Sequence, residues 1–265
     1  SFAFALPCNT PGLKFLCRES LDLGRSHFDH PLGSRFEEMD AIVFFNDVLV
    51  PWERVFLLGD VELCNNWGVA TNRNVHTGQQ VVTKQVVKAE FMLGLANLMV
   101  QTLGSDQVPH VQQMIAEIIE NLEVTKACLR AAEADARLDQ WGVMCPAQFP
   151  LMIARAQFIR SYPRMAEILH MLGSSSLMAL PTEADLNGPL ADEIHRYMGT
   201  DTASAEERVR LCRLAWDTCC SAFATRQVLY ERWFGGDSFR NAIILANVYD
   251  REPMTHWVRE FLEQE

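Results

Sequence analysis

The stretch HFDHPLGSRFEEMDAIVFFNDVLVPWERVFLLGD, residues 27–60, places a dense cluster of chemically capable side chains beside a clear strand pattern. Its second half contains IVFFNDVLVP, a β-branched and aromatic run typical of a strand, which an Asn-Asp pair interrupts and Pro51 ends. Its first half is rich in His, Asp, Ser, Arg and Glu around Pro31 and Gly33, which predicts a loop. Because polar groups on a braced loop often bind ligands or catalyse reactions, we take this stretch as the candidate site.

The chain before this stretch also has the pattern of β structure. Residues 2–6 form a short apolar run, and residues 13–17 are a second candidate strand. Together with residues 41–50 they predict part of a sheet, since so small a sheet is marginally stable alone. We therefore expect residues 1–60 to be the C-terminal part of a larger β-domain.

The pattern changes after residue 60. Residues 61–78 are rich in Asn and predict a connector, and residues 79–265 have helical periodicity, which indicates a helical bundle with a C-terminal extension. Ser204 and Glu207 form a capping-box pattern, and Pro163 predicts a kink or break in the middle of one helix. The expected helices cover residues 79–103, 107–140, 149–172, 191–197, 204–235, 241–249 and 254–262.

The composition is that of an ordinary globular protein of 265 residues with 49% hydrophobic residues. The net charge of −11 argues against nucleic acid and anionic membranes as partners, because no basic surface would attract them. The sequence has no apolar run long enough for a membrane span and no visible signal-peptide pattern, although it begins at Ser1. We expect a cytoplasmic protein.

Eight cysteines are spread along the chain without a C-x-x-C pair. Their spacing favours reduced, buried thiols in a reducing compartment. They occupy positions 8, 17, 64, 128, 145, 212, 219 and 220.

Three separated motifs resemble the oxygenase components of two-component flavin monooxygenases, the family of 4-hydroxyphenylacetate 3-monooxygenase and chlorophenol monooxygenases. The wider relatives of that family are acyl-CoA dehydrogenases. The resemblance implies a mainly α, acyl-CoA dehydrogenase-like fold in which the end of a middle β-domain precedes a C-terminal four-helix bundle. The motifs are FDHPLGSRFEEMDAIVFFNDVLVPWERVF (28–56), LPTEADLNGPL (180–190), and ERVRLCRLAWD with RQVLYERWFGGD (207–217 and 226–237).

The resemblance also implies a function, namely hydroxylation of a phenol, such as 4-hydroxyphenylacetate or a chlorophenol, with reduced FAD (FADH2) and O2. A separate flavin reductase would supply the reduced flavin, and the assembly would be a homotetramer. No G-x-G-x-x-G follows a strand, so the sequence does not predict a nicotinamide site of its own.

His30, with Asp29 and Arg35, is the first candidate constellation. A histidine can take a proton from a phenol, whose pKa is about 10, and an arginine can stabilise the phenolate. The residues alone favour a histidine that caps a turn, whereas the resemblance implies that His30 and Arg35 are catalytic. A metal site built from His27, Asp29 and His30 is a weaker reading, because Pro31 restricts the geometry, and we assign no metal ligands.

The second constellation is the segment Gly235, Gly236, Asp237 and Ser238. Glycines after a helix let backbone amides approach a ligand, although a plain glycine cap explains them equally well. The resemblance implies that this segment binds FAD.

Other functions remain open on the sequence. An acyl-CoA dehydrogenase-type enzyme would need a catalytic glutamate that no pattern singles out. A radical dehydratase of the 4-hydroxybutyryl-CoA type would need cysteine and histidine ligands for an iron–sulfur cluster, which the scattered cysteines do not match. A non-catalytic helical interaction module would bind no flavin.

Overall fold

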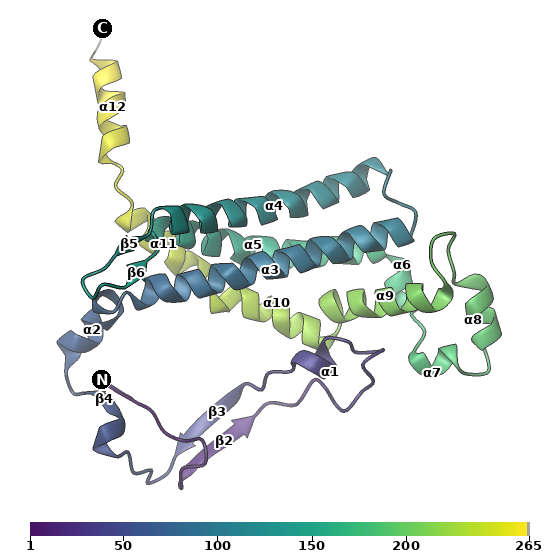
Figure 1. Ribbon diagram of the computed structural model, residues 1–265, viewed down its shortest axis with the longest axis horizontal. Helices are drawn as coiled ribbons and strands as arrows, with labels where there is room; N and C mark the ends of the chain where they lie inside the picture. Colours follow the sequence, from purple (N-terminus) through teal and green to yellow (C-terminus); the bar gives the residue numbers. More distant parts are fainter. Residues whose placement is uncertain (264–265) are drawn as a thin grey trace.

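The computed structural model describes residues 1–263, and it consists of a β-rich N-terminal segment and a long helical body (Figure 1). In the segment, β1 (Phe2–Phe4) pairs with β4 (Val55–Leu58), and β2 (Leu13–Cys17) pairs with β3 (Ala41–Phe45), both antiparallel. The three predicted strands are therefore present, but in two separate pairs. β3 stops at Phe45, short of the expected Val50, because Asp47 has a φ of 48° that turns the chain.

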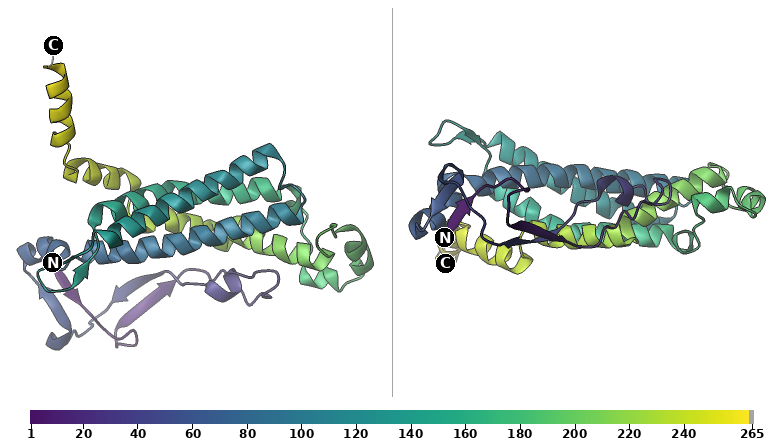
Figure 2. Two further views of the ribbon diagram at one scale, coloured as in Figure 1. Left: turned by 45° about the horizontal axis from the view of Figure 1, so that its top comes forward. Right: turned by 90° about the horizontal axis from the view of Figure 1, so that it is seen from below.

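The helical body is built around four helical layers. The helices α3 (Arg73–Thr102), α4 (Pro109–Ala134) and α5 (Gln148–Gly173) pack side by side, and the consecutive helices α9 (Ala205–Cys219) and α10 (Ala222–Phe234) form the fourth layer (Figures 1 and 2). The core is mostly apolar, with Met92, Met99, Ile118, Phe158, Met165 and Ile168 among its fully buried side chains. The predicted helical bundle is confirmed.

The expected connector at 61–78 is helical for most of its length. It contains α2 (Val61–Ala70) and the first residues of α3, and Asn72 in the left-handed conformation makes the turn between them. Asn tolerates this conformation better than most residues, which is why an Asn-rich stretch can turn sharply and still be helical on either side.

The helix expected to reach Gln140 ends earlier, at Ala134. A small hairpin follows it, with β5 (Arg137–Leu138) paired to β6 (Met144–Cys145). The Asp139 carboxylate accepts hydrogen bonds from the backbone N–H groups of Trp141 (2.8 Å) and Val143 (2.9 Å). These local bonds compete with continuation of the helix.

The capping box at Ser204 is confirmed, because Ser204 and Glu207 each accept from the other's backbone N–H. The single helix expected from this cap to Gly235 is wrong, however, since it divides into α9 and α10. Ser221 makes the division: its Oγ accepts from Ala224 N at 3.1 Å and thus caps the start of α10.

The break expected at Pro163 is absent. α5 is continuous through this position, with Phe158, Tyr162 and Met165 buried on either side of the proline. Tertiary packing against the other helices holds α5 together where the local signal predicts interruption.

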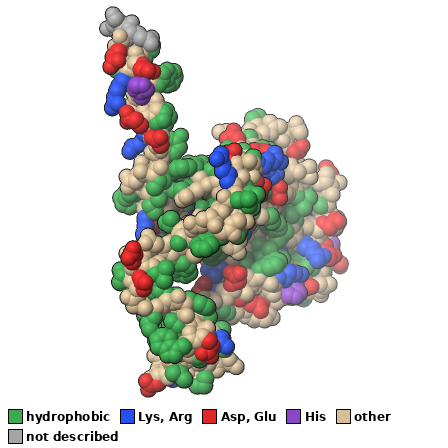
Figure 3. Space-filling model, turned by 60° about the vertical axis from the view of Figure 1, so that its left-hand side comes forward, with side chains coloured by type: hydrophobic (Ala, Val, Ile, Leu, Met, Phe, Trp, Pro, Cys, Tyr) green, Lys and Arg blue, Asp and Glu red, His purple; other side chains and the backbone are tan. Residues whose placement is uncertain are grey.

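Short helices complete the chain. They are α1 (Gly33–Phe36), the single 3₁₀ turn Trp52–Arg54, α6 (Ser175–Met178), α7 (Glu183–Leu186), the predicted α8 (Ala191–Tyr197), α11 (Ser238–Val248) and α12 (Glu252–Leu262). α12 stands away from the body as an arm (Figures 1 and 3). Within residues 1–263, no helix is both long and apolar enough to cross a membrane.

Candidate functional site

The loop that contains His30 is fixed to the helical body by Asp217 at the end of α9. One oxygen of this buried carboxylate accepts from the backbone N–H groups of Leu32 (2.7 Å) and Gly33 (2.8 Å). The other accepts from Ser221 Oγ at 2.7 Å. The first N–H groups of a helix have no partner within the helix, so a carboxylate satisfies them and anchors α1.

Arg213, one turn before Asp217, fixes a second loop. Its guanidinium donates to the carbonyl oxygens of Leu180 (2.8 Å) and Pro181 (2.6 and 2.8 Å) and lies 3.4 Å from Asp29. Asp29 in turn accepts from Glu183 N at 3.0 Å. The three sequence motifs therefore meet at one place, through contacts between residues as far as 185 positions apart in the chain.

A groove of about 670 Å³ runs between the segment at 32–38 and the helices of the body. Figure 2 shows this segment lying along the bundle. The walls are mostly apolar, as in many cofactor and ligand sites. The lining residues are Leu32, Phe36, Glu38, Thr83, Lys84, Val87, Lys88, Phe91, Met92, Tyr162, Asp217, Thr218, Phe223, Gln227 and Tyr230.

Two lysines on α3 supply the positive charge of this groove. Lys84 Nζ and Lys88 Nζ lie 2.8 Å and 2.6 Å from Glu231, whose side chain is 1% exposed. Both ammonium groups also lie over the ring of Tyr230, at 4.9 and 5.7 Å from its centroid. Burial lowers the pKa of Lys84, and the hydrogen bond that Lys84 donates to Glu231 opposes this shift. Two cations therefore share one buried carboxylate beside an aromatic wall.

His30 lines a smaller cavity of about 210 Å³ together with Asp217, Cys220 and Phe223. The backbone holds it on both sides: its N–H donates to Ser26 O, and its carbonyl accepts from Ser34 N, both at 3.0 Å. Burial lowers the pKa of His30, and the nearby positive charge of Arg25 lowers it further. The ring is therefore held in its neutral form, which accepts a proton.

Arg35 lies outside both cavities. It is exposed and donates to the carbonyl oxygens of Pro31 (2.8 Å) and His27 (3.2 Å). Its guanidinium thus closes the loop around His30 and makes no contact with the His30 ring.

The three residues considered as a possible metal site have different partners in the structure. His27 Nδ1 lies 2.7 Å from Ser34 Oγ, Asp29 faces Arg213, and His30 Nε2 lies 3.3 Å from Arg25. Within the described part of the chain, these three do not form a group compact enough to hold an ion.

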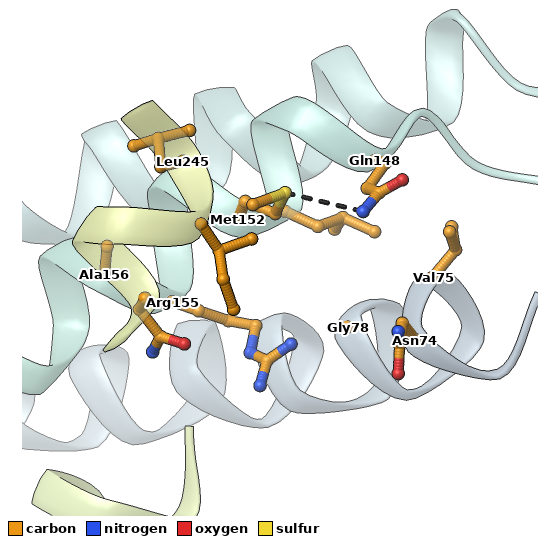
Figure 4. A pocket seen from close by; sticks show the side chains of 11 residues that line it. Asn74, Val75, Gly78, Gln148, Met152, Arg155, Ala156 and Leu245 are labelled. Carbon is orange, nitrogen blue, oxygen red and sulfur yellow. Dashed lines mark hydrogen bonds between the residues drawn. The ribbon is translucent and has the colours of Figure 1, made fainter. Parts of the chain in front are cut away.

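The segment Gly235–Ser238 connects α10 to α11. The Gly235 carbonyl accepts from Arg155 (2.8 Å) and Asn241 (2.9 Å), Gly236 has a φ of +94°, and Asp237 caps α11. The segment thus ends α10 and caps the start of α11, as the glycine-cap alternative expects. A small cavity of about 200 Å³ adjoins it, with Arg155 reaching across from α5 towards α3 (Figure 4).

The two predicted constellations lie at opposite ends of α10. Phe223, at its beginning, packs against Gly33 of the His30 loop, whereas Gly235 follows its end. A helix of 13 residues is about 20 Å long. The structure therefore separates the two constellations by the length of α10 and does not bring them into contact; the groove lies between them, lined by Phe223, Gln227 and Tyr230 of α10.

The sequence patterns did not single out five charged residues of this site. They are Arg213, Asp217, Lys84, Lys88 and Glu231. A signal exists for the first two, because they follow Val209 at successive spacings of four and so fall on the buried face of α9. Charged residues on an apolar face are buried only when paired, which marks them as anchors.

A separate group of side chains lies at the α9–α10 junction. The sulfurs of Cys219 and Cys220 are 3.7 Å apart, and His170 Nε2 lies 2.6 Å from Cys219 O. The neighbouring Cys219 thiol and His170 lower the pKa of Cys220 to about 7. All eight cysteines are free, as predicted, but the expectation of burial is wrong for Cys8, Cys17 and Cys64, which are exposed.

Comparison with known proteins agrees with this geometry. The family model described as "4-hydroxyphenylacetate 3-hydroxylase C terminal" matches residues 64–263, and the corresponding N-terminal model matches residues 1–57. The oxygenase component of 4-hydroxyphenylacetate 3-monooxygenase from Thermus thermophilus is 49% identical over 100% of this chain. The match covers 55% of that relative's length, so the chain spans about half of it.

Solved structures show the same relationship. The oxygenase component of 4-hydroxyphenylacetate 3-monooxygenase complexed with FAD and 4-hydroxyphenylacetate superposes with a TM-score of 0.96 at 49% identity, over 100% of this chain and 56% of that one. An archaeal 4-hydroxybutyryl-CoA dehydratase, at 16% identity and a TM-score of 0.87 over 100% of this chain and 53% of that one, shares the fold alone. The mainly α, acyl-CoA dehydrogenase-like fold is confirmed. The chain belongs to the 4-hydroxyphenylacetate 3-hydroxylase family.

Proposed function

We propose that this chain forms the C-terminal part of an oxygenase component that hydroxylates a phenol with reduced FAD and O2. The observation that carries this proposal is the meeting of the three family motifs at the His30 loop, which borders an apolar groove. The resemblance to oxygenase components of 4-hydroxyphenylacetate 3-monooxygenase supports it. A 4-hydroxyphenylacetate-like phenol is the preferred substrate class, ahead of a chlorophenol.

The groove suits a flavin in shape and charge. Its aromatic and aliphatic walls fit a planar ring system, and the ammonium groups of Lys84 and Lys88 can donate to an anionic group of the ligand. We assign FAD to this groove, with Gly235, Gly236, Asp237 and Ser238 as contacts at its far end. The roughly 20 Å length of α10 is a distance that an extended dinucleotide can cover. When bound, reduced FAD supplies the chemistry that activates O2.

His30 is assigned the role of general base. Its neutral ring can accept the phenol proton, and an electron-rich phenolate ring is the form that an oxygenating species attacks. The backbone bonds at Ser26 and Ser34 fix the His30 backbone, and the ring nitrogen Nε2 lies 3.3 Å from Arg25 Nη1. We assign Arg35 a positioning role, because its hydrogen bonds to His27 O and Pro31 O hold the loop around His30.

The assembly would depend on further partners. A separate flavin reductase would supply reduced FAD, and four copies of the protein would assemble. We place the protein in the cytoplasm, because three exposed free thiols persist best in a reducing compartment.

The test joins this chain to the N-terminal half of its Thermus thermophilus relative, which supplies the part that the chain does not span. The extended protein is mixed anaerobically with reduced FAD and 4-hydroxyphenylacetate and then exposed to O2. The expected result is a catechol product, formed in proportion to the flavin oxidised. The N-terminal half alone is the control and should give none.

Formation of hydrogen peroxide without catechol from any phenol tested would contradict the proposal. Oxidation of an acyl-CoA by the same protein would instead indicate an acyl-CoA dehydrogenase-type activity.

A further inference from the structure

The division between α9 and α10 turns two adjacent cysteines towards each other. In a continuous helix, neighbouring side chains point in different directions and do not face each other. Here Cys219 ends α9 and Cys220 is its C-cap, with Ser221 starting the next helix. As a result the two sulfurs lie 3.7 Å apart, with Cys219 buried and Cys220 half-buried.

His170 reaches the same point from the last turn of α5. Its Nε2 lies 2.6 Å from the Cys219 carbonyl oxygen, so Nε2 carries the proton, because a carbonyl can only accept. The other nitrogen of a neutral ring then keeps its lone pair. A histidine anchored to a backbone carbonyl in this way is the form that binds metal ions.

We infer that His170, Cys219 and Cys220 form a binding site for one thiophilic divalent cation of the zinc class. One ring nitrogen of His170 and the sulfurs of Cys219 and Cys220 lie within 4.8 Å of one another. Two thiolates bound to a tetrahedral zinc ion at about 2.3 Å lie about 3.8 Å apart. The observed separation of the sulfurs is 3.7 Å, so their spacing matches that of two thiolates on one zinc ion.

The surroundings leave room for a fourth ligand. Cys220 borders the cavity of about 210 Å³ that His30 and Ser221 also line, and His170 is exposed to solvent. An ion can therefore reach the site, and a water molecule can complete its coordination. The bound ion would tie α5 to the α9–α10 junction beneath the His30 loop. This inference does not depend on flavin chemistry.

The experiment uses cobalt(II) as a spectroscopic probe, because cobalt in a tetrahedral thiolate site has strong visible and near-ultraviolet absorption and the hydrated ion does not. The chain carries serine in place of Cys8, Cys17 and Cys64, whose exposed thiols would bind metal between molecules. Titration under a phosphine reductant should give one cobalt per chain with thiolate absorption, and zinc should displace it.

Cys220→Ser and His170→Ala should each weaken cobalt binding by about tenfold or more, since even the partners of metal ligands contribute that much. Cys212→Ser, which changes a buried thiol on the same helix, should leave binding unchanged. Circular dichroism of each variant checks folding, and His170, being exposed, provides a variant that leaves the core intact. Equal cobalt binding in all variants, or no thiolate absorption in the parent protein, would overturn the inference.

Discussion

His30 owes its chemistry to its surroundings. Burial and the charge of Arg25 both disfavour the imidazolium and lower its pKa, although Asp217 and Asp29 act in the opposite direction. Because the folded-state pKa lies below that of the unfolded chain, the folded state binds fewer protons. Neutral His30 makes its full contribution to the free energy of unfolding above about pH 6.5. This contribution decreases as the pH falls below that value.

The first prediction concerns His30→Ala in the extended protein. Loss of a general base should reduce phenol hydroxylation by about 10²–10⁴-fold, while oxidation of the reduced flavin continues and releases more hydrogen peroxide. The measurement is product formed per reduced FAD consumed. His27→Ala in the same loop is the control and should keep the product ratio. An unchanged rate and ratio in His30→Ala would show that His30 only caps the turn.

For single residues, the sequence predicted roles that depend on neighbours in the chain better than roles that depend on residues far away in the chain. The His30 loop and the Ser204–Glu207 cap depend on neighbours within a few residues, and both were predicted. The anchoring by Asp217 was not, because its partners at Leu32 and Gly33 lie 185 and 184 residues away. No local pattern contains such a contact.

At the scale of elements, an ion-pair network fastens the β-rich segment to α10. Arg226 on α10 lies 2.7 Å from Asp40, and Arg18 lies 2.9 Å from Asp40 and 2.6 Å from Glu37. Hydrogen bonds from Arg226 first, and then from Arg18, lower the pKa of Asp40 to about 2. This network determines how the segment closes one side of the groove.

The second prediction is that this attachment weakens in acid. The pKa of Asp40 is lower in the folded protein than in the unfolded chain, where it is near 4. The contribution of Asp40 to stability is therefore complete above about pH 4 and is lost as the pH falls towards about 2. Asp40→Asn should reproduce the acid state at neutral pH. Amide hydrogen exchange should then become faster in β2 and β3, while α3 to α5 stay protected.

The matched control is Asp47→Asn, which removes the same charge from the same segment away from Arg226. It should leave exchange in β2 unchanged. Equal exchange in wild type and Asp40→Asn would mean that apolar contacts alone hold the segment.

Helix periodicity predicted the long elements well and their junctions poorly. α5 and α8 agree closely with the expected ranges. The division at Ser221 and the hairpin after Ala134 each depend on one side chain, Ser221 or Asp139, that accepts hydrogen bonds from nearby backbone N–H groups. Several local conformations compete to form such bonds, and the tertiary fold decides which of them persists.

At the scale of the whole molecule, much apolar surface is uncovered. α12 projects from the body with its large apolar side chains exposed (Figure 3). Those on α12 are Met254, Trp257, Val258, Phe261 and Leu262, with exposures between 44% and 73%. An arm of this kind is stable in water when another chain covers it, which supports the proposed homotetramer.

The third prediction is that the extended protein is a tetramer by light scattering and that Trp257→Glu with Phe261→Glu shifts it to smaller species. A charge on the apolar face of α12 would have to be buried without a partner. Thr255→Glu on the same helix adds a charge without removing an aromatic side chain and should affect assembly less. A monomeric wild-type protein would contradict the proposed assembly.

The most direct test of the central claim, that reduced FAD occupies the groove between the His30 segment and the bundle, is anaerobic titration of reduced FAD into the extended protein and two variants. Val87→Trp fills the groove from α3, whereas Val124→Trp makes the same change at another exposed position, on α4, outside it. The account predicts that Val87→Trp weakens binding by about tenfold or more, equivalent to about 1.4 kcal/mol, and that Val124→Trp binds like wild type. Equal affinity for wild type and both variants would contradict it.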